Sequence, residues 1–268
     1  MLKEDTAKAA DGEVLRYRVT GSGPVRLALT HSLAMNGAFW DPLIKELGDD
    51  YSVLTWDCRG HGRSGKPAGP YTVEQFADDL AAVFDAAGWP RAICAGASMG
   101  GTVTLAFAAA HTERVAGLGL IDTTASYGVG AREAWEERAA KAEAEGLASL
   151  TAFQKTRWFS DAFNSSHGAV VQHCVDIFCA NDLAAYQETC RMLGRADLTG
   201  KLGSIEVPTM ILVGEEDYAT PLPMAEAMHA AIAGSTLEVI PGARHLTPLE
   251  CPELIADRLA TLVKRVAA

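Results

Sequence analysis

Short, nearly continuous apolar runs alternate with helix-like segments in the first part of the chain, and this alternation restricts the chain to few folds. Residues 25–30, 52–57, 91–95 and 115–121 have the pattern of buried strands bounded by turn signals. Residues 72–88 instead carry apolar side chains at helical spacing behind a Thr-x-x-Gln capping box. Strands that are apolar on both faces and alternate with helices predict an α/β fold, with a mostly parallel sheet covered on both faces.

The middle of the chain breaks this alternation. Between residues 126 and 202 the sequence lacks strand-like runs, and charged residues and helix formers dominate. Strand and helix signals return from residue 207 onward and end in an amphipathic helix. We therefore predict an α/β core made of residues 1–125 and 203–268, interrupted by an all-helical insertion over residues 126–202.

The charge balance argues against several classes of partner. Lys and Arg number 23 and Asp and Glu number 34, so the formal net charge is −11. We expect so acidic a chain to bind neither nucleic acid nor an anionic membrane face. Because the sequence has neither the apolar run of a signal peptide nor a stretch long enough to span a membrane, we expect a cytoplasmic protein. The six cysteines lack zinc-site spacing, so we expect reduced thiols and no metal.

The segment Gly96–Gly101 has the form Gly-x-Ser-x-Gly at the point where a predicted strand ends and a helix begins. In this context the pattern is typical of a strained turn that exposes a nucleophilic serine, here Ser98, above the sheet. The two glycines that flank the serine let neighbouring backbone pass close to it. The N-terminus of the following helix favours negative charge beside it. Ser98 is therefore the predicted nucleophile.

A serine hydroxyl needs a base to remove its proton, and the base needs a carboxylate to orient it. His245 lies five residues past the last predicted strand and before the final helix, so we predict that it is the base. Asp217 follows the preceding strand and is the predicted carboxylate. Glu215, Glu216 and Asp122 remain alternatives, whereas the other histidines are interpreted as structural.

Two backbone N–H groups are predicted to bind the oxyanion that forms during acyl transfer. One belongs to Met99, directly after the nucleophile, and the other to Leu33, in the turn after the strand at 25–30. The glycine-rich segment Asp57–Ser64 does not match a phosphate-binding loop. We interpret it as a structural turn in which Asp57 and Arg59 bond to backbone groups.

Taken together, these motifs resemble the α/β-hydrolase superfamily over nearly the whole chain. The matching segments are His31–Leu33, Asp57–Ser64, Gly96–Gly101, Gly214–Asp217 and Gly242–His245. The resemblance implies an α/β-hydrolase fold with a mostly parallel eight-stranded sheet, helices on both faces and a helical cap formed by the insertion. It also implies triad roles for Ser98, Asp217 and His245 and oxyanion roles for Leu33 and Met99, and it calls for no cofactor.

Within that superfamily the chain is similar to the 3-oxoadipate enol-lactonase group. The local similarity lies in residues 31–42, 56–80, 157–163 and 181–198. That group often has Asn at the position of His31 and Leu at the position of Ala97. We expect both residues to line the pocket and to affect which lactone is bound.

The insertion carries the expected substrate contacts. We expect Trp135, Trp158 and Phe159 to cover an apolar pocket and Arg157 to pair with a substrate carboxylate. The predicted protein is a cofactor-independent serine hydrolase of a small lactone or ester. The alternatives are a carbon–carbon bond hydrolase of ring-cleavage products, a cofactor-free haloperoxidase, and a non-catalytic ligand-binding protein. The sequence leaves the oligomeric state open, a homo-oligomer included.

Overall fold

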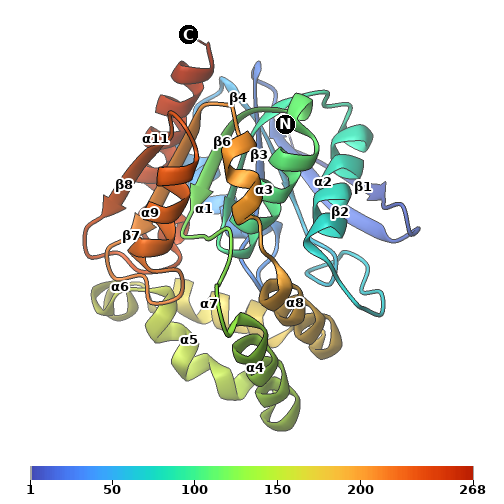
Figure 1. Ribbon diagram of the computed structural model, residues 1–268, viewed down its shortest axis with the longest axis vertical. Coiled ribbons are helices and arrows are strands. Elements are labelled where there is room, and N and C mark those ends of the chain that lie inside the picture. The colour runs from blue at the N-terminus through green and yellow to red at the C-terminus, as the bar shows by residue number, and fades with distance from the viewer. Residues whose placement is uncertain (1, 268) are drawn as a thin grey trace.

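The structure, a computed structural model, describes residues 2–267 and contains an eight-stranded sheet (Figure 1). The strands lie in the order β1-β2-β4-β3-β5-β6-β7-β8. The strands from β4 to β8 in this order run parallel to one another, and β1 and β2 add an antiparallel edge. The strand bounds are Leu2–Lys8 (β1), Val14–Gly21 (β2), Val25–Thr30 (β3), Tyr51–Trp56 (β4), Ala92–Ala97 (β5), Val115–Ile121 (β6), Thr209–Gly214 (β7) and Thr236–Ile240 (β8). The predicted mostly parallel sheet is confirmed.

The hairpin of β1 and β2 is a feature that the predicted strands do not include. Its outer strand β1 lies at the edge of the sheet and buries only Ala7 of its seven residues, so its sequence is mostly polar. Strand β2 does alternate, with Leu15 and Tyr17 buried, and Gly12 lies in the turn between the strands with φ 92°. This period-two pattern is the signal that could have predicted β2.

Helices cover both faces of the sheet (Figure 1). Outside the insertion they are η1 (Gly37–Trp40), α1 (Asp41–Glu46), α2 (Val73–Ala87), α3 (Met99–Ala110), η2 (Thr112–Arg114), η4 (Thr199–Ser204), α9 (Leu222–Ala231), α10 (Thr247–Glu250) and α11 (Pro252–Ala267). A side chain at Gly96 would meet α3, and Gly96 pairs with Leu120 of β6. Gly117 lies three residues before Leu120 on the same strand. A side chain added at Gly117 would meet α11 instead. Since successive strand residues point to opposite faces, α3 and α11 lie on opposite sides of the sheet.

The insertion consists of helices. They are α4 (Ala131–Glu145), η3 (Leu147–Leu150), α5 (Thr151–Trp158), α6 (Asp161–Ser166), α7 (Gly168–Cys179) and α8 (Leu183–Arg195). These helices gather at one end of the molecule, below the sheet in the view of Figure 1, and α4 packs against α8. A single β-bridge between Ser126 and Asp197 joins the two ends of the insertion. Within residues 2–267, no helix combines the length and the apolar character that crossing a membrane requires.

Candidate active site

Ser98 stands in the tight turn between β5 and α3. Its φ of 55° and ψ of −124° are unfavourable for a residue with a side chain, and strain of this kind costs about 1–3 kcal/mol. Gly96 and Gly100 make the turn possible, because a Cβ at either would overlap a backbone carbonyl, that of Gly100 or that of Thr30. The hydroxyl of Thr123 donates to the Ser98 carbonyl at 2.6 Å. The turn therefore holds the serine side chain at the start of α3.

Three side chains singled out from the sequence meet in one hydrogen-bonded row. His245 lies in the loop between β8 and α10, with its Nε2 2.8 Å from Oγ of Ser98. Its Nδ1 lies 2.8 Å from Oδ2 of Asp217, which follows β7. Because an ionised carboxylate only accepts hydrogen bonds, the proton of the neutral imidazole lies on Nδ1. Nε2 is then free to accept the proton of the serine hydroxyl.

The carboxylate of Asp217 is held by donors besides the imidazole. Its Oδ1 accepts the N–H groups of Ala219 at 2.7 Å and Thr220 at 2.9 Å, and the Thr220 hydroxyl donates to Oδ2 at 2.9 Å. Burial would raise the pKa of Asp217, but the facing His245 and these hydrogen bonds outweigh burial and hold the pKa below its usual range. The carboxylate therefore stays ionised, as stabilisation of a positively charged imidazole requires.

The alternative carboxylates bond elsewhere. Asp122, at the end of β6, accepts the Gly214 N–H at 3.1 Å and both the N–H and the hydroxyl of Thr247, at 3.0 Å and 2.6 Å. Burial, and after it the charge of Asp217, raises the pKa of Asp122. Glu215 and Glu216 bond to the loop that follows β8. In the described part of the chain none of these three bonds to the imidazole.

The two N–H groups expected to bind an oxyanion lie at the start of α3 and in the segment after β3. Met99 is the first residue of α3, where helical N–H groups have no acceptor within the helix. Leu33 borders the same cavity as Ser98. The carbonyl of its neighbour Ala34 accepts a hydrogen bond from Asn181 of the insertion at 2.8 Å. Neither N–H group has a hydrogen-bond acceptor among residues 2–267, so both can donate to a ligand oxygen.

A cavity of about 30 Å³ lies in front of the serine hydroxyl. Its lining draws on the core and the insertion: Ser32, Leu33, Ser98, Tyr127, Trp135, Arg138, Gln154, Arg157, Trp158, Phe178, Ala219 and His245. The structure thus places Trp135, Arg157 and Trp158 at the cavity. Phe159 is not among the lining residues; it is fully buried and stacks on Phe163 with ring centroids 4.9 Å apart.

Several lining residues were not anticipated from the sequence. Tyr127 packs edge-on against Trp135, with ring centroids 5.0 Å apart. Arg138 follows Trp135 by three residues on α4, and residues at this spacing share a helix face. That spacing is the signal that could have identified Arg138. Gln154 and Phe178 come from α5 and α7, and their approach depends on how the helices of the insertion pack.

The expectation that His31 and Ala97 line the pocket is wrong. Neither residue borders the cavity, and both are fully buried. His31 bonds to backbone on both sides, with Nδ1 2.8 Å from the Ser32 carbonyl and Nε2 accepting the Cys58 N–H at 3.0 Å. Burial lowers the pKa of His31 to about 4, so the ring is neutral near pH 7. His31 therefore joins the segment after β3 to the turn after β4.

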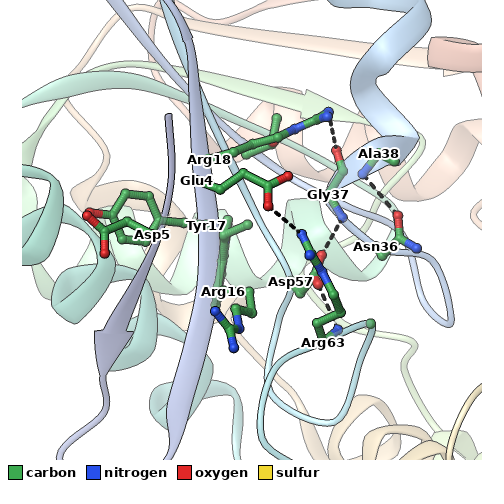
Figure 2. Close-up of a pocket in the computed structure, with 13 residues that line it drawn as sticks. Glu4, Asp5, Arg16, Tyr17, Arg18, Asn36, Gly37, Ala38, Asp57 and Arg63 are labelled. Atoms are coloured by element: carbon green, nitrogen blue, oxygen red, sulfur yellow. Dashed lines mark hydrogen bonds and ion pairs between the residues drawn. The ribbon is translucent and has the colours of Figure 1, made fainter. Parts of the chain in front are cut away.

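A second cavity, of about 320 Å³, lies beside the turn that follows β4 (Figure 2). Two of the three arginines that line it are already paired, Arg63 with Glu4 at 3.1 Å and Arg18 with Asp41. Asp57 accepts two backbone N–H groups at 2.8 Å each, as predicted for a structural turn. We therefore interpret this charged region as one that holds the sheet edge together.

The prediction that Arg59 of the same turn bonds to backbone groups is wrong. Its guanidinium bonds to the carboxylates of Asp79, twice at 2.6 Å, and of Asp11 at 2.8 Å, instead of to backbone groups. The arginine and Asp79 are both buried, so each charge needs the other. The pair fastens the turn to α2.

Comparisons with known proteins give the same fold. A profile of the alpha/beta hydrolase fold family matches residues 26–252. The chain is 30% identical to 3-oxoadipate enol-lactonase 1 of Acinetobacter baylyi over 95% of both chains. It is similar to the crystal structure of the enol-lactonase from Burkholderia xenovorans LB400, with a TM-score of 0.92, 30% identity, and coverage of 97% of this chain and 100% of that one. An esterase from Thermogutta terrifontis, solved with malate bound, has a TM-score of 0.91 and 29% identity over 100% of both chains. These matches confirm the predicted fold class.

Proposed function

The chain belongs to the α/β-hydrolase family, and we propose that it is a cofactor-independent serine hydrolase of small lactones or carboxylic esters. The observation that carries the proposal is the pair of 2.8 Å contacts that joins Ser98 to His245 and His245 to Asp217. Similarity to two 3-oxoadipate enol-lactonases of Acinetobacter baylyi, over almost the whole chain, favours a lactone over an open-chain ester.

Acylation follows from this geometry. As Oγ of Ser98 attacks the acyl carbon, Nε2 of His245 accepts its proton, and the carbonyl electrons move to the oxygen. Asp217 holds the Nδ1–H and stabilises the imidazolium. The N–H groups of Leu33 and Met99 donate to the oxyanion. When the intermediate collapses, the ring oxygen of a lactone, or the alcohol oxygen of an ester, leaves with the proton from His245.

Deacylation repeats these steps with water as the nucleophile. His245 removes a proton from water while the water oxygen attacks the acyl carbon. The intermediate then expels Oγ of Ser98, which regains its proton from the imidazolium. The products are a carboxylic acid and a hydroxyl group, which a lactone carries on one molecule.

We propose that the insertion acts as a cap that moves when the substrate enters. The cavity of about 30 Å³ corresponds to about one water molecule, and its walls are proposed to move apart when a lactone binds. Arg157 borders both this cavity and an outer groove of about 410 Å³. In that groove Phe153 and Tyr218 expose their rings, and the Arg157 guanidinium lies 5.2 Å from the centre of the Phe153 ring. This groove is the proposed entrance.

A substrate panel tests the proposal. It contains small lactones, 4-nitrophenyl esters, vinylogous diketones and a halide-dependent oxidation assay, each with the wild-type chain and with Ser98→Ala. We expect serine-dependent hydrolysis of a lactone or an ester. Consumption of the diketones alone would indicate a carbon–carbon bond hydrolase, and serine-dependent halide oxidation alone a haloperoxidase. Tight ligand binding without turnover would indicate a binding protein.

We expect Gly100→Ala to lower both stability and activity. The added Cβ would collide with the carbonyl oxygens of Thr30 and His31, and backbone cannot move aside as the end of a side chain can. Overpacking of this kind costs about 1–3 kcal/mol, and a shift of the serine by about 1 Å costs roughly a hundredfold in rate. Thermal unfolding and kcat/KM measure the two effects. Gly48→Ala is the matched control, because its added Cβ meets no atom within 4 Å; equal effects of the two substitutions would contradict this explanation.

A further inference from the structure

Arg244 directly precedes His245, and its side chain extends from the loop after β8 to the C-terminal end of α5. The two hydrogens of its Nη1 are shared among three acceptors at 3.0 Å each, the carbonyls of Thr156 and Phe159 and Oδ1 of Asp161. The last carbonyls of a helix have no partner within the helix, and a cation at this end also suits the helix dipole. Because Arg244 is buried, its guanidinium takes these partners in place of water.

The guanidinium of Arg244 also contacts the loop after β7, which carries Asp217. Its Nε donates to Oε2 of Glu216 at 3.2 Å, and Glu216 directly precedes Asp217. The guanidinium lies 5.5 Å from the centre of the ring of Tyr218, which directly follows Asp217. The residue before His245 is therefore joined both to the neighbours of Asp217 and to the insertion.

Backbone hydrogen bonds run beside this contact. The His245 N–H donates to the Arg157 carbonyl at 3.3 Å, and the Leu246 N–H donates to the Trp158 carbonyl at 3.0 Å. Arg157 and Trp158 both border the cavity of about 30 Å³. A movement of the end of α5 away from the core would therefore break these bonds together with those of Arg244.

A second side chain links two of the same segments. Glu250 of α10 accepts the backbone N–H of Ser160 and that of Arg244, each at 3.2 Å. It has no hydrogen bond to the loop after β7. Within residues 2–267, Arg244 is the side chain whose hydrogen bonds reach both the insertion and the loop after β7.

We propose that Arg244 is a positioning residue that couples the insertion to the loops after β7 and β8. With α5 against the core, its guanidinium fixes the loops of Asp217 and His245 relative to each other. The inference rests on the proposed hydrolase function. Arg244 and Asp161 also border the outer groove that is the proposed entrance, so opening of this groove moves partners of the arginine.

The coupling makes full catalytic geometry depend on closure of the insertion. When α5 moves outward, the guanidinium loses three of its four hydrogen-bond acceptors and keeps only Glu216. The loops after β7 and β8 are then held less firmly. The geometry is restored when α5 returns over the enclosed substrate, as closure completes the site in other enzymes with a lid.

Turnover of 4-nitrophenyl acetate by variants of Arg244 tests the proposal. A displacement of about 1 Å at a catalytic group costs roughly a hundredfold in rate, so Arg244→Gln should lower kcat per titrated active site at least about tenfold. KM should change by less than about threefold, because the arginine does not touch the substrate. Arg244→Lys should restore part of kcat, since its ammonium can bond to the end of α5 but lacks the second donor that faces Glu216.

Arg258→Gln is the matched control. Arg258 also pairs with a carboxylate through two hydrogen bonds, to Glu238 at 2.5 Å and 2.8 Å, and in the described part of the chain it bonds to neither the insertion nor the loop after β7. Its replacement should leave kcat within about twofold of the wild type. A kcat of Arg244→Gln equal to that of this control, or a loss confined to KM, would overturn the proposal.

A double-mutant cycle with Glu216→Ala separates coupling from a general loss of stability. Glu216 touches the loop of His245 through Arg244, so Glu216→Ala should lower kcat by itself. The double variant should then lose about as much kcat as Arg244→Gln alone, because residues in one network are not additive. Effects that multiply in the double variant would contradict a link through this pair.

Proton NMR supplies a readout that needs no substrate. The Nδ1–H of His245 bonds to the buried Asp217 at 2.8 Å and should give a separate downfield resonance, identified by its loss in His245→Gln. We expect this resonance to broaden or disappear in Arg244→Gln and to persist in Arg258→Gln. A sharp, unshifted resonance in Arg244→Gln would overturn the proposal. Absence of serine-dependent ester hydrolysis by the wild-type chain would instead contradict the proposed function, and the NMR comparison would still decide the coupling.

Discussion

Replacement of Ser98 with alanine is expected to lower kcat for the hydrolysed lactone or ester about 10⁴- to 10⁶-fold. In the proposed mechanism the hydroxyl that His245 Nε2 contacts at 2.8 Å forms the acyl-enzyme, and alanine has no group to replace it. The proposed oxyanion donors are backbone N–H groups and remain in the variant, so some activity above the uncatalysed rate should persist. Steady-state kinetics with active-site-titrated enzyme measures the loss.

The matched control for this loss is Ser22→Ala, which removes an exposed hydroxyl from the turn between β2 and β3. It should leave kcat within about twofold, as surface substitutions usually have small effects. A Ser98→Ala variant that retains a tenth or more of the wild-type kcat would exclude the covalent mechanism.

Asp217→Asn is expected to lower kcat about 10⁴-fold. The N–H groups of Ala219 and Thr220 hold Oδ1, so the amide oxygen of an asparagine takes that place and its NH₂ faces His245. An NH₂ donates to Nδ1 and shifts the imidazole proton to Nε2. The nitrogen that faces Ser98 then carries a proton and cannot accept another. The shape of the site is kept, so kcat should fall far more than KM rises.

Asp122→Asn is the control that separates the two buried carboxylates. Asp122 bonds to Gly214 and Thr247 and not to the imidazole, so its replacement should affect stability more than kcat. If Asp122→Asn lowered kcat as far as 10⁴-fold while Asp217→Asn stayed active, the carboxylate would be assigned to the wrong residue.

The same Asp217 substitution changes how stability depends on pH. The pKa of Asp217 is lower in the folded chain than its unfolded value of about 3.9. Its ionised form therefore stabilises the fold above pH of about 4, and this contribution disappears as the pH falls through the folded pKa. The difference in unfolding temperature between the wild type and Asp217→Asn should be largest near neutral pH and shrink below pH 4. A difference that grows toward acid would contradict a depressed pKa.

The sequence predicts the row of Ser98, Asp217 and His245 because each residue lies in the segment that follows a parallel strand. The carboxyl ends of such strands meet at one edge of the sheet, so short local signals are enough to bring distant residues together. The apolar strand runs that define this edge are equally local, and the predicted parallel sheet is confirmed. The predicted strands omit only β1 and its partner β2. Strand β1 is mostly polar and buries a single residue, so it gives little signal.

The cavity wall is harder to predict than the sheet edge. Gln154 and Phe178 reach it from helices whose crossing depends on tertiary packing within the insertion, which no short pattern encodes. His31 was expected at the wall because the enol-lactonase group often has Asn at this position, but its ring bonds to the backbone of Ser32 and Cys58. Arg138 had a usable signal in its spacing from Trp135, since both lie on one face of α4.

The most direct test of the covalent mechanism is to trap the acyl-enzyme. The wild-type chain is mixed with a 4-nitrophenyl ester, quenched in acid during turnover, digested, and analysed by peptide mass spectrometry. We expect the acyl group on the peptide that contains Ser98, and on no peptide of the Ser98→Ala variant. An acyl group on a different residue, or steady turnover by Ser98→Ala, would contradict the mechanism.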